Sequence, residues 1–131
     1  MAKEEIGANS VFTGPQKGLT VIGNHCYAFS GSVGVNNSDV EMLSFTTGKD
    51  YIVAKITMGS KAGNADDMKF WININGNLIY SGYEALVSMP TQQYLNILIP
   101  PNSFVELYAR NIGSATNRDM ECVLVGKVYE E

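Results

Sequence analysis

The stretch that decides the fold runs from Met68 to Tyr80 and reads Met-Lys-Phe-Trp-Ile-Asn-Ile-Asn-Gly-Asn-Leu-Ile-Tyr. Apolar residues occupy every second position from Met68 to Ile74, which is the period of a β-strand whose successive side chains point to opposite faces. Asn75 and Gly76 then supply two residues that tolerate positive φ, as the tight turn of a β-hairpin requires. The stretch therefore predicts a hairpin. Its inward face would carry Met68, Phe70, Ile72 and Ile74, and its outer face Lys69, Trp71 and Asn73.

The same alternation recurs on both sides of this hairpin. Apolar residues alternate with polar ones from 41 to 58, around a turn signal at Gly48-Lys49-Asp50, and this pattern predicts a second hairpin. Another pair of alternating segments is interrupted at Pro100-Pro101, where the chain must leave the ladder because proline has no amide hydrogen to donate. We therefore expect a corner at residues 100–103 and a last strand from Met120 to Tyr129.

Three segments are less regular. Residues 19–29 predict either one long bulged strand or two short ones, since Gly23 and Asn24 interrupt them. Residues 30–38 are rich in Gly, Asn and Ser and predict a flexible connection. The only helix candidate, Tyr83 to Met89, is equally compatible with an extended crossover. About eight strands without an intervening helix favour an all-β fold, an antiparallel two-sheet β-sandwich of jelly-roll-like type.

Composition limits the function classes. The 131 residues fit one domain, with 45 % apolar and 17 % charged residues as in a folded globular protein. The net charge of −4 makes nucleic acid an improbable partner, because binding to phosphates requires a dense basic surface. The longest apolar runs are far short of a membrane span, and no secretory signal precedes them. We expect no membrane partner, and Cys26 and Cys122 as buried free thiols.

No motif indicates catalysis. The lone histidine, His25, lies beside Cys26, but neighbours on a strand point to opposite faces and cannot form a nucleophilic pair. Asp66 and Asp67 lie in an oxygen-rich loop, yet two carboxylates without the alternating-acid spacing of a calcium loop favour a solvated turn. We therefore predict a protein that is not an enzyme, with no catalytic, cofactor-binding or metal-binding residues.

Aromatic residues are the candidates for an interface. Exposed Trp and Tyr are enriched at protein interfaces, although core packing and cross-strand pairing are equally ordinary roles for them. Met1 to Phe12 look too polar for a core strand, so we predict an N-terminal arm at residues 1–12, which docks on a neighbouring subunit, and a sandwich domain at residues 13–131. The predicted interface residues are Trp71, Tyr80, Tyr94, Tyr108 and Phe12.

The C-terminal half resembles small β-sandwich virion structural and decoration proteins of tailed phages and other double-stranded DNA viruses. The resemblance rests on Leu98-Ile99-Pro100-Pro101-Asn102-Ser103, on the strand that follows it, and on Val123-Leu124-Val125-Gly126-Lys127-Val128-Tyr129. In that family a strand runs into an I-P-P-N corner and the chain closes on an L-x-G-[RK]-V-Y strand. The similarity spans roughly residues 68 to 129.

This resemblance implies a capsid decoration (cement) or minor capsid protein, made in the host cytoplasm and incorporated in the virion. Its partners would be the major capsid protein or other virion proteins, and it would form a homo-oligomer such as a trimer. The alternative reading is a carbohydrate-binding or receptor-binding β-sandwich module, for which Trp71 and the outer tyrosines are the motivating residues.

Overall fold

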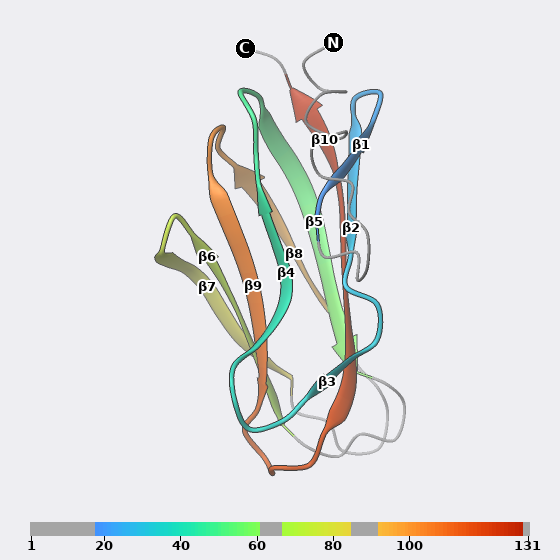
Figure 1. The fold of residues 1–131 in the computed structure, drawn as a ribbon, viewed down its shortest axis with the longest axis vertical. Helices are drawn as coiled ribbons and strands as arrows, with labels where there is room; N and C mark the ends of the chain where they lie inside the picture. The colour runs from blue at the N-terminus through green and yellow to red at the C-terminus, as the bar shows by residue number, and fades with distance from the viewer. Residues whose placement is uncertain (1–17, 61–66, 85–91, 130–131) are drawn as a thin grey trace.

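The computed structural model describes residues 18–60, 67–84 and 92–129, which form two packed antiparallel sheets (Figure 1). The described residues contain strands and no helix, so the predicted all-β, jelly-roll-like sandwich is confirmed. These described ranges contain ten strands rather than about eight. They are β1 (Thr20–Ile22), β2 (His25–Phe29), β3 (Val33–Val35), β4 (Val40–Thr46), β5 (Tyr51–Ser60), β6 (Met68–Ile74), β7 (Asn77–Glu84), β8 (Gln92–Ile99), β9 (Phe104–Asn111) and β10 (Arg118–Tyr129).

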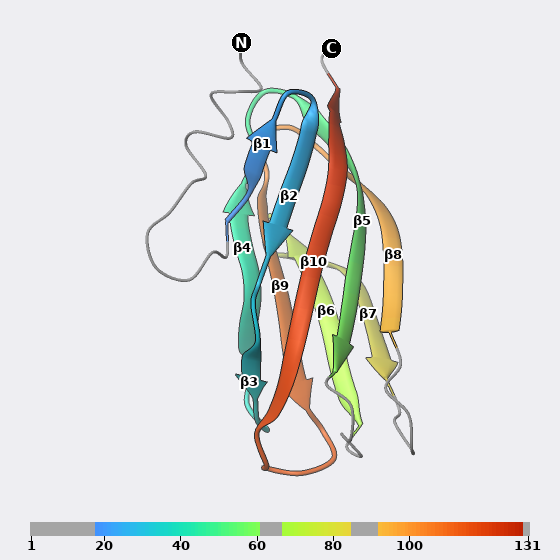
Figure 2. The ribbon, with the colours of Figure 1, turned by 90° about the vertical axis from the view of Figure 1, so that its right-hand side faces the viewer.

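The two sheets differ in size. The six-stranded sheet has the order β1-β2-β10-β5-β8, with β3 also pairing with β10, and Figure 2 shows these strands side by side. The four-stranded sheet has the order β4-β9-β6-β7. The central strand β10 is twelve residues long, and it pairs with β5 along one side and with both β2 and β3 along the other. The last described strand therefore pairs with strands near the start of the described chain.

The hairpin predicted from Met68 to Tyr80 is present as β6 and β7. Ile74 lies opposite Asn77, and the two turn residues have positive φ, 53° at Asn75 and 81° at Gly76, as a type I′ turn requires. The register shifts between Ile72 and Asn73, where a β-bulge adds a residue to β7.

The second predicted hairpin is wrong, because β4 belongs to the four-stranded sheet and β5 to the six-stranded sheet. The turn at Gly48-Lys49-Asp50 is an arch that carries the chain from one sheet to the other. It stacks on the corner between β8 and β9, where the Thr47 amide donates to the Ser103 carbonyl at 2.8 Å and the Asn102 amide donates to the Gly48 carbonyl at 2.7 Å. Polar turn residues are compatible both with a hairpin within one sheet and with an arch between two sheets. These hydrogen bonds between distant segments stabilise the arch.

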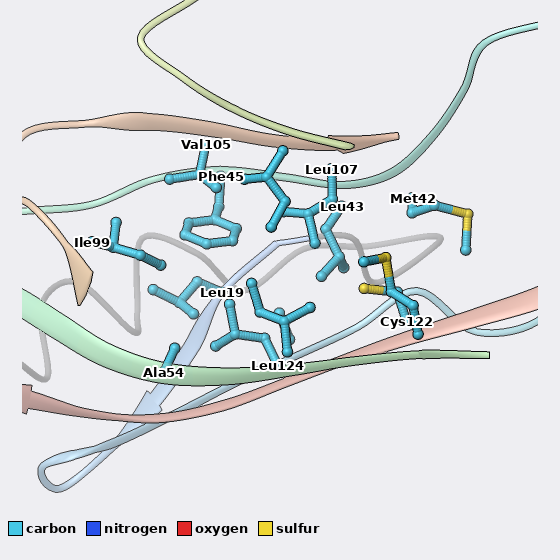
Figure 3. Close-up of a cluster of buried hydrophobic side chains, with 14 of the residues drawn as sticks. Leu19, Met42, Leu43, Phe45, Ala54, Ile99, Val105, Leu107, Cys122 and Leu124 are labelled. Carbon is cyan, nitrogen blue, oxygen red and sulfur yellow. The ribbon is translucent and has the colours of Figure 1, made fainter. Parts of the chain in front are cut away.

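The core lies between the sheets, where the predicted inward faces meet (Figure 3). Leu43, Phe45, Val105 and Leu107 point from the four-stranded sheet toward Ala54 and Leu124 on the six-stranded one. A register shift between Glu41 and Leu43 allows both Met42 and Leu43 to be buried. The inward residues of the edge strand β8, Leu95 and Ile97, are only partly covered.

The three less regular segments contain strands where the structure describes them. Residues 19–29 form two strands, β1 and β2, joined at Gly23 with φ 63°. Residues 30–38, predicted as a flexible connection, connect β2 to β4 and contain the three-residue strand β3, which pairs with β10. Tyr83 and Glu84 of the helix candidate belong to β7, and the rest of that candidate lies outside the described residues, as does the predicted arm at residues 1–12. In the described part of the chain no helix is long and apolar enough to span a membrane.

Candidate functional surfaces

The outer side of the four-stranded sheet carries a stacked aromatic pair. Trp71 on β6 lies directly opposite Tyr108 on β9, and their ring centroids are 5.6 Å apart with 15° between the planes. The Lys69 ammonium lies 5.3 Å from the centroid of the Trp71 ring, within cation–π range. We call this surface the aromatic face. It comprises Lys69, Trp71, Asn73, Glu106, Tyr108 and Arg110.

Charged groups surround the pair on both sides. The Tyr108 hydroxyl donates a hydrogen bond to Glu106 Oε2 at 3.0 Å. This bond, followed by partial burial and the nearby charges of Glu106, Glu41 and Asp39, raises the pKa of Tyr108 above its ordinary value. Arg110 Nη1 contacts Asp39 Oδ1 at 3.1 Å, and both side chains are about half exposed. The tyrosine side of the face is therefore acidic.

The aromatic face is hollowed next to Trp71. A shallow open cavity of about 400 Å³ lies there, large enough for a small ligand. Ser81 lies opposite Trp71 on β7, and its small side chain leaves space beside the indole. The lining residues are Asp39, Lys69, Trp71, Asn73, Leu78, Ser81 and Arg110. Indole, amide, hydroxyl, ammonium and guanidinium groups converge on one cavity.

The outer side of the six-stranded sheet is different, because large apolar side chains cover it. Val125 on β10 lies opposite Tyr27 on β2, and Val53 on β5 lies opposite Leu98 on β8. These side chains are between 41 % and 58 % exposed. We call this surface the apolar face. It comprises Tyr27, Phe29, Val53, Leu98, Val125 and Tyr129.

Basic side chains lie among these apolar ones. Lys127 is opposite both His25 and Val53, and Lys55 is opposite Val125. A very open depression of about 340 Å³ lies over these residues. At its edge Tyr129 stacks on Tyr51, with ring centroids 5.7 Å apart. This surface thus combines apolar and basic side chains over a shallow depression, whereas polar groups and an indole line the cavity of the aromatic face.

The predicted interface residues do not all lie together. Trp71 and Tyr108 meet on the aromatic face. Tyr80 lies opposite buried Ile72 and packs on the core, so it is on the other side of that sheet. Tyr94 pairs with Thr57 through β8, but its side chain lies outside the described residues, and so does Phe12.

Sequence reasoning missed the apolar face. In β2 and β10 the residues of both parities are apolar over several positions, Tyr27 and Phe29 outward and Cys26 and Ala28 inward. A strand that is apolar on both faces is covered on both faces in most folds. The sequence carries this signal at residues 26–29 and 122–125, where apolar residues follow one another without a break.

The groups with nucleophilic potential are separated or shielded. His25 is exposed and Cys26 is buried, so their side chains point to opposite faces, as alternation along a strand predicts. Burial raises the pKa of Cys26 and of Cys122 to about 12, and both thiols are free. Among the described residues, no group of three or more His, Cys, Asp or Glu side chains could hold a metal ion.

Comparison with known proteins identifies the fold. No protein-family model matches the sequence, and no curated protein matches it significantly. Among solved structures, the chain is similar to the CBM36-1 domain of a multidomain xylanase from the hindgut metagenome of Trinervitermes trinervoides. The TM-score is 0.52 at 12 % identity, over 82 % of this chain and 100 % of that domain.

A second similar structure is that of the infectious bursal disease virus Gx strain. Its TM-score is 0.50 at 9 % identity, and the match covers 89 % of this chain but only 36 % of the viral chain. A CBM35 domain from Cellvibrio japonicus Abf62 matches with a TM-score of 0.45 at 12 % identity, over 92 % of this chain and 78 % of that one. At such identities the first two comparisons establish a jelly-roll β-sandwich and do not establish a function.

Proposed function

We propose that this chain is a virion structural protein, a capsid decoration or minor capsid protein that binds the major capsid lattice through its apolar face. The observation that carries the proposal is the row of exposed large apolar side chains on the outer side of the six-stranded sheet. Exposed apolar patches on soluble proteins mark interaction sites. Neighbouring strands contribute the apolar residues as pairs, Val125 with Tyr27 and Val53 with Leu98, and the two lysines of this face lie between the pairs.

Two further observations support this choice of partner. The corner at Pro100–Ser103 and the final strand ending at Tyr129 have the sequence pattern of small virion β-sandwiches, and that final strand, β10, lies at the centre of the apolar face. A similar fold also occurs in a virus structure. The proposal includes a homo-oligomer such as a trimer, assembly in the host cytoplasm, residence in the virion, and no catalytic activity.

Solution mass and sedimentation with capsids test the proposal. We expect the purified chain to form a species that is a multiple of its 14.3 kDa mass and to sediment with capsids of its source virus. Val125→Lys should lose the capsid binding with an unchanged melting temperature, whereas Trp71→Ser, on the opposite sheet, is the matched control and should still bind. A wild-type chain that stays monomeric at high concentration and does not sediment with capsids of its source virus contradicts the assembly function.

A second function, carbohydrate binding, is favoured by a separate observation, the cavity beside Trp71. Aromatic rings provide flat apolar contact for the C–H faces of sugars, and the surrounding polar groups can bind hydroxyls. A similar fold occurs in a carbohydrate-binding module. Because Trp71 is the single tryptophan, glycan binding should change the intrinsic fluorescence directly. A glycan array without binders, together with unchanged fluorescence, would exclude this function.

A further inference from the structure

The cavity on the aromatic face contains two cations in an acidic chain. Its lining holds Lys69 and Arg110 against a single acid, Asp39, whereas the whole chain has a net charge of −4. The acids Glu41 and Glu106 lie near Tyr108 and are not among the lining residues. The cavity lining therefore holds more cations than acids, in contrast to the chain as a whole.

The two cations lie side by side on this face. Lys69 on β6 is directly opposite Arg110 on β9, and Arg110 Nη1 contacts Asp39 Oδ1 at 3.1 Å. An ammonium and a guanidinium group therefore reach the same cavity from adjacent strands.

The neighbouring groups define what the cations could bind. Trp71 lies next to Lys69 along β6, and the ammonium is held 5.3 Å from the indole centroid. A ligand with an apolar ring face could pack on the indole and place an anionic group within reach of both Lys69 and Arg110. Guanidinium groups bind planar carboxylates with two parallel hydrogen bonds. The amide of Asn73 and the hydroxyl of Ser81 remain for neutral hydroxyl groups.

We propose that this cavity binds saccharides that carry a carboxylate, such as uronic or sialic acids, with the sugar ring on Trp71 and the carboxylate at Lys69 and Arg110. The proposal rests on the carbohydrate-binding function above and names its ligand class. Neutral sugars of the same size lack the group that the two cations would bind. Simple carboxylates lack the ring that would contact the indole, so both parts of the ligand are needed.

Fluorescence of Trp71 and calorimetry test the proposal with two matched pairs of probes. We expect 3′-sialyllactose or trigalacturonate to bind at least tenfold more tightly than lactose or xylotriose, and the affinity to fall as salt is raised. The double variant Lys69→Gln/Arg110→Gln should lose at least tenfold for the acidic probes. Lys55→Gln/Lys127→Gln on the six-stranded sheet removes the same charge and should have no effect.

The other outcomes distinguish a failure of the carboxylate assignment from a failure of carbohydrate binding itself. Equal affinity for acidic and neutral probes would overturn the carboxylate assignment and leave carbohydrate binding in place. If neither kind of probe binds, both fail. Sodium acetate that displaces the acidic saccharide at comparable concentration would show a simple anion site and would also overturn the proposal. Unchanged melting temperatures establish that the variants are folded.

Discussion

Gly126 on β10 faces Ala54 on β5 so closely that any Cβ atom at this position would press on β5. A Cβ atom built on Gly126 would lie 2.7 Å from the Val53 carbonyl oxygen and 3.1 Å from the Ala54 Cβ. The first contact, with the backbone, is shorter than real Cβ atoms show, and the second is tighter than most real Cβ contacts. The absence of a side chain at Gly126 therefore allows the two longest strands to pair at normal spacing beneath the apolar face.

Replacing this glycine should destabilise the sandwich. We expect Gly126→Ala to lower the free energy of unfolding by about 1–3 kcal/mol, the usual cost of overpacking a core. Gly34→Ala is the matched control, since its nearest neighbour would be 3.7 Å away in ordinary contact. Urea denaturation measures both. Equal stability of the two variants would show that β5 and β10 can separate without cost.

The buried hydroxyl of Thr47 supports the arch between the sheets. It donates to the Pro100 carbonyl at 2.9 Å and accepts from the Ser103 amide at 2.9 Å. Thr47→Val keeps the shape but removes this hydrogen-bonding group, and a buried group left unsatisfied costs about 1–3 kcal/mol. We expect a loss of stability of this size by denaturation.

The neighbouring position provides the control for this experiment. Thr46 is exposed at the end of β4, so Thr46→Val should change stability by less than about 0.5 kcal/mol, as surface substitutions usually do. A Thr47→Val protein as stable as wild type would mean that the two corners do not depend on each other.

The sequence predicted what depends on local chemistry. The alternation from Met68 to Ile74 and the Asn75-Gly76 turn specified both the β6–β7 hairpin and the outward position of Trp71. The pairing of Trp71 with Tyr108 could not be predicted, because β9 inserts between β4 and β6 and no local signal reports such an order. The same reason explains the error at β4 and β5. The turn between them was predicted correctly, but the two strands belong to different sheets rather than to one hairpin.

The cavity was also beyond prediction. Trp71 and Tyr108 were expected outside on the sandwich, but the cavity needs Ser81 from β7 and Asp39 from the segment before β4. These residues are brought together by strand order and register alone. No sequence motif links Lys69 to Arg110. Their proximity follows only from the pairing of β6 with β9.

The two buried thiols should make stability depend on alkaline pH. Each pKa is raised from 9.0 to about 12 because burial disfavours the thiolate. Above pH 9 the unfolded chain releases these protons and the folded chain retains them, so the free energy of unfolding falls as pH rises. The expected slope is about 1.4 kcal/mol per pH unit for each thiol.

Denaturation between pH 8 and 11 measures this slope, and Cys122→Ala supplies the comparison. The variant will be less stable at pH 8 because it leaves a small cavity, but its stability should fall less steeply, by the share of one thiol. A slope identical to that of wild type would mean that Cys122 ionises as readily in the folded state as in the unfolded chain.

Glu106 should control the ionisation of Tyr108, and Trp71 can report it. The hydrogen bond from the Tyr108 hydroxyl to Glu106 is the largest cause of the raised pKa, since losing the proton replaces this bond with repulsion between two anions. The stacked Trp71 ring, 5.6 Å away, should lose fluorescence when the tyrosinate forms. We expect the midpoint of an alkaline fluorescence titration to move to lower pH in Glu106→Gln. Glu121→Gln, on the other sheet, removes the same charge and should leave the midpoint in place, whereas an equal shift in both variants would assign the effect to net charge.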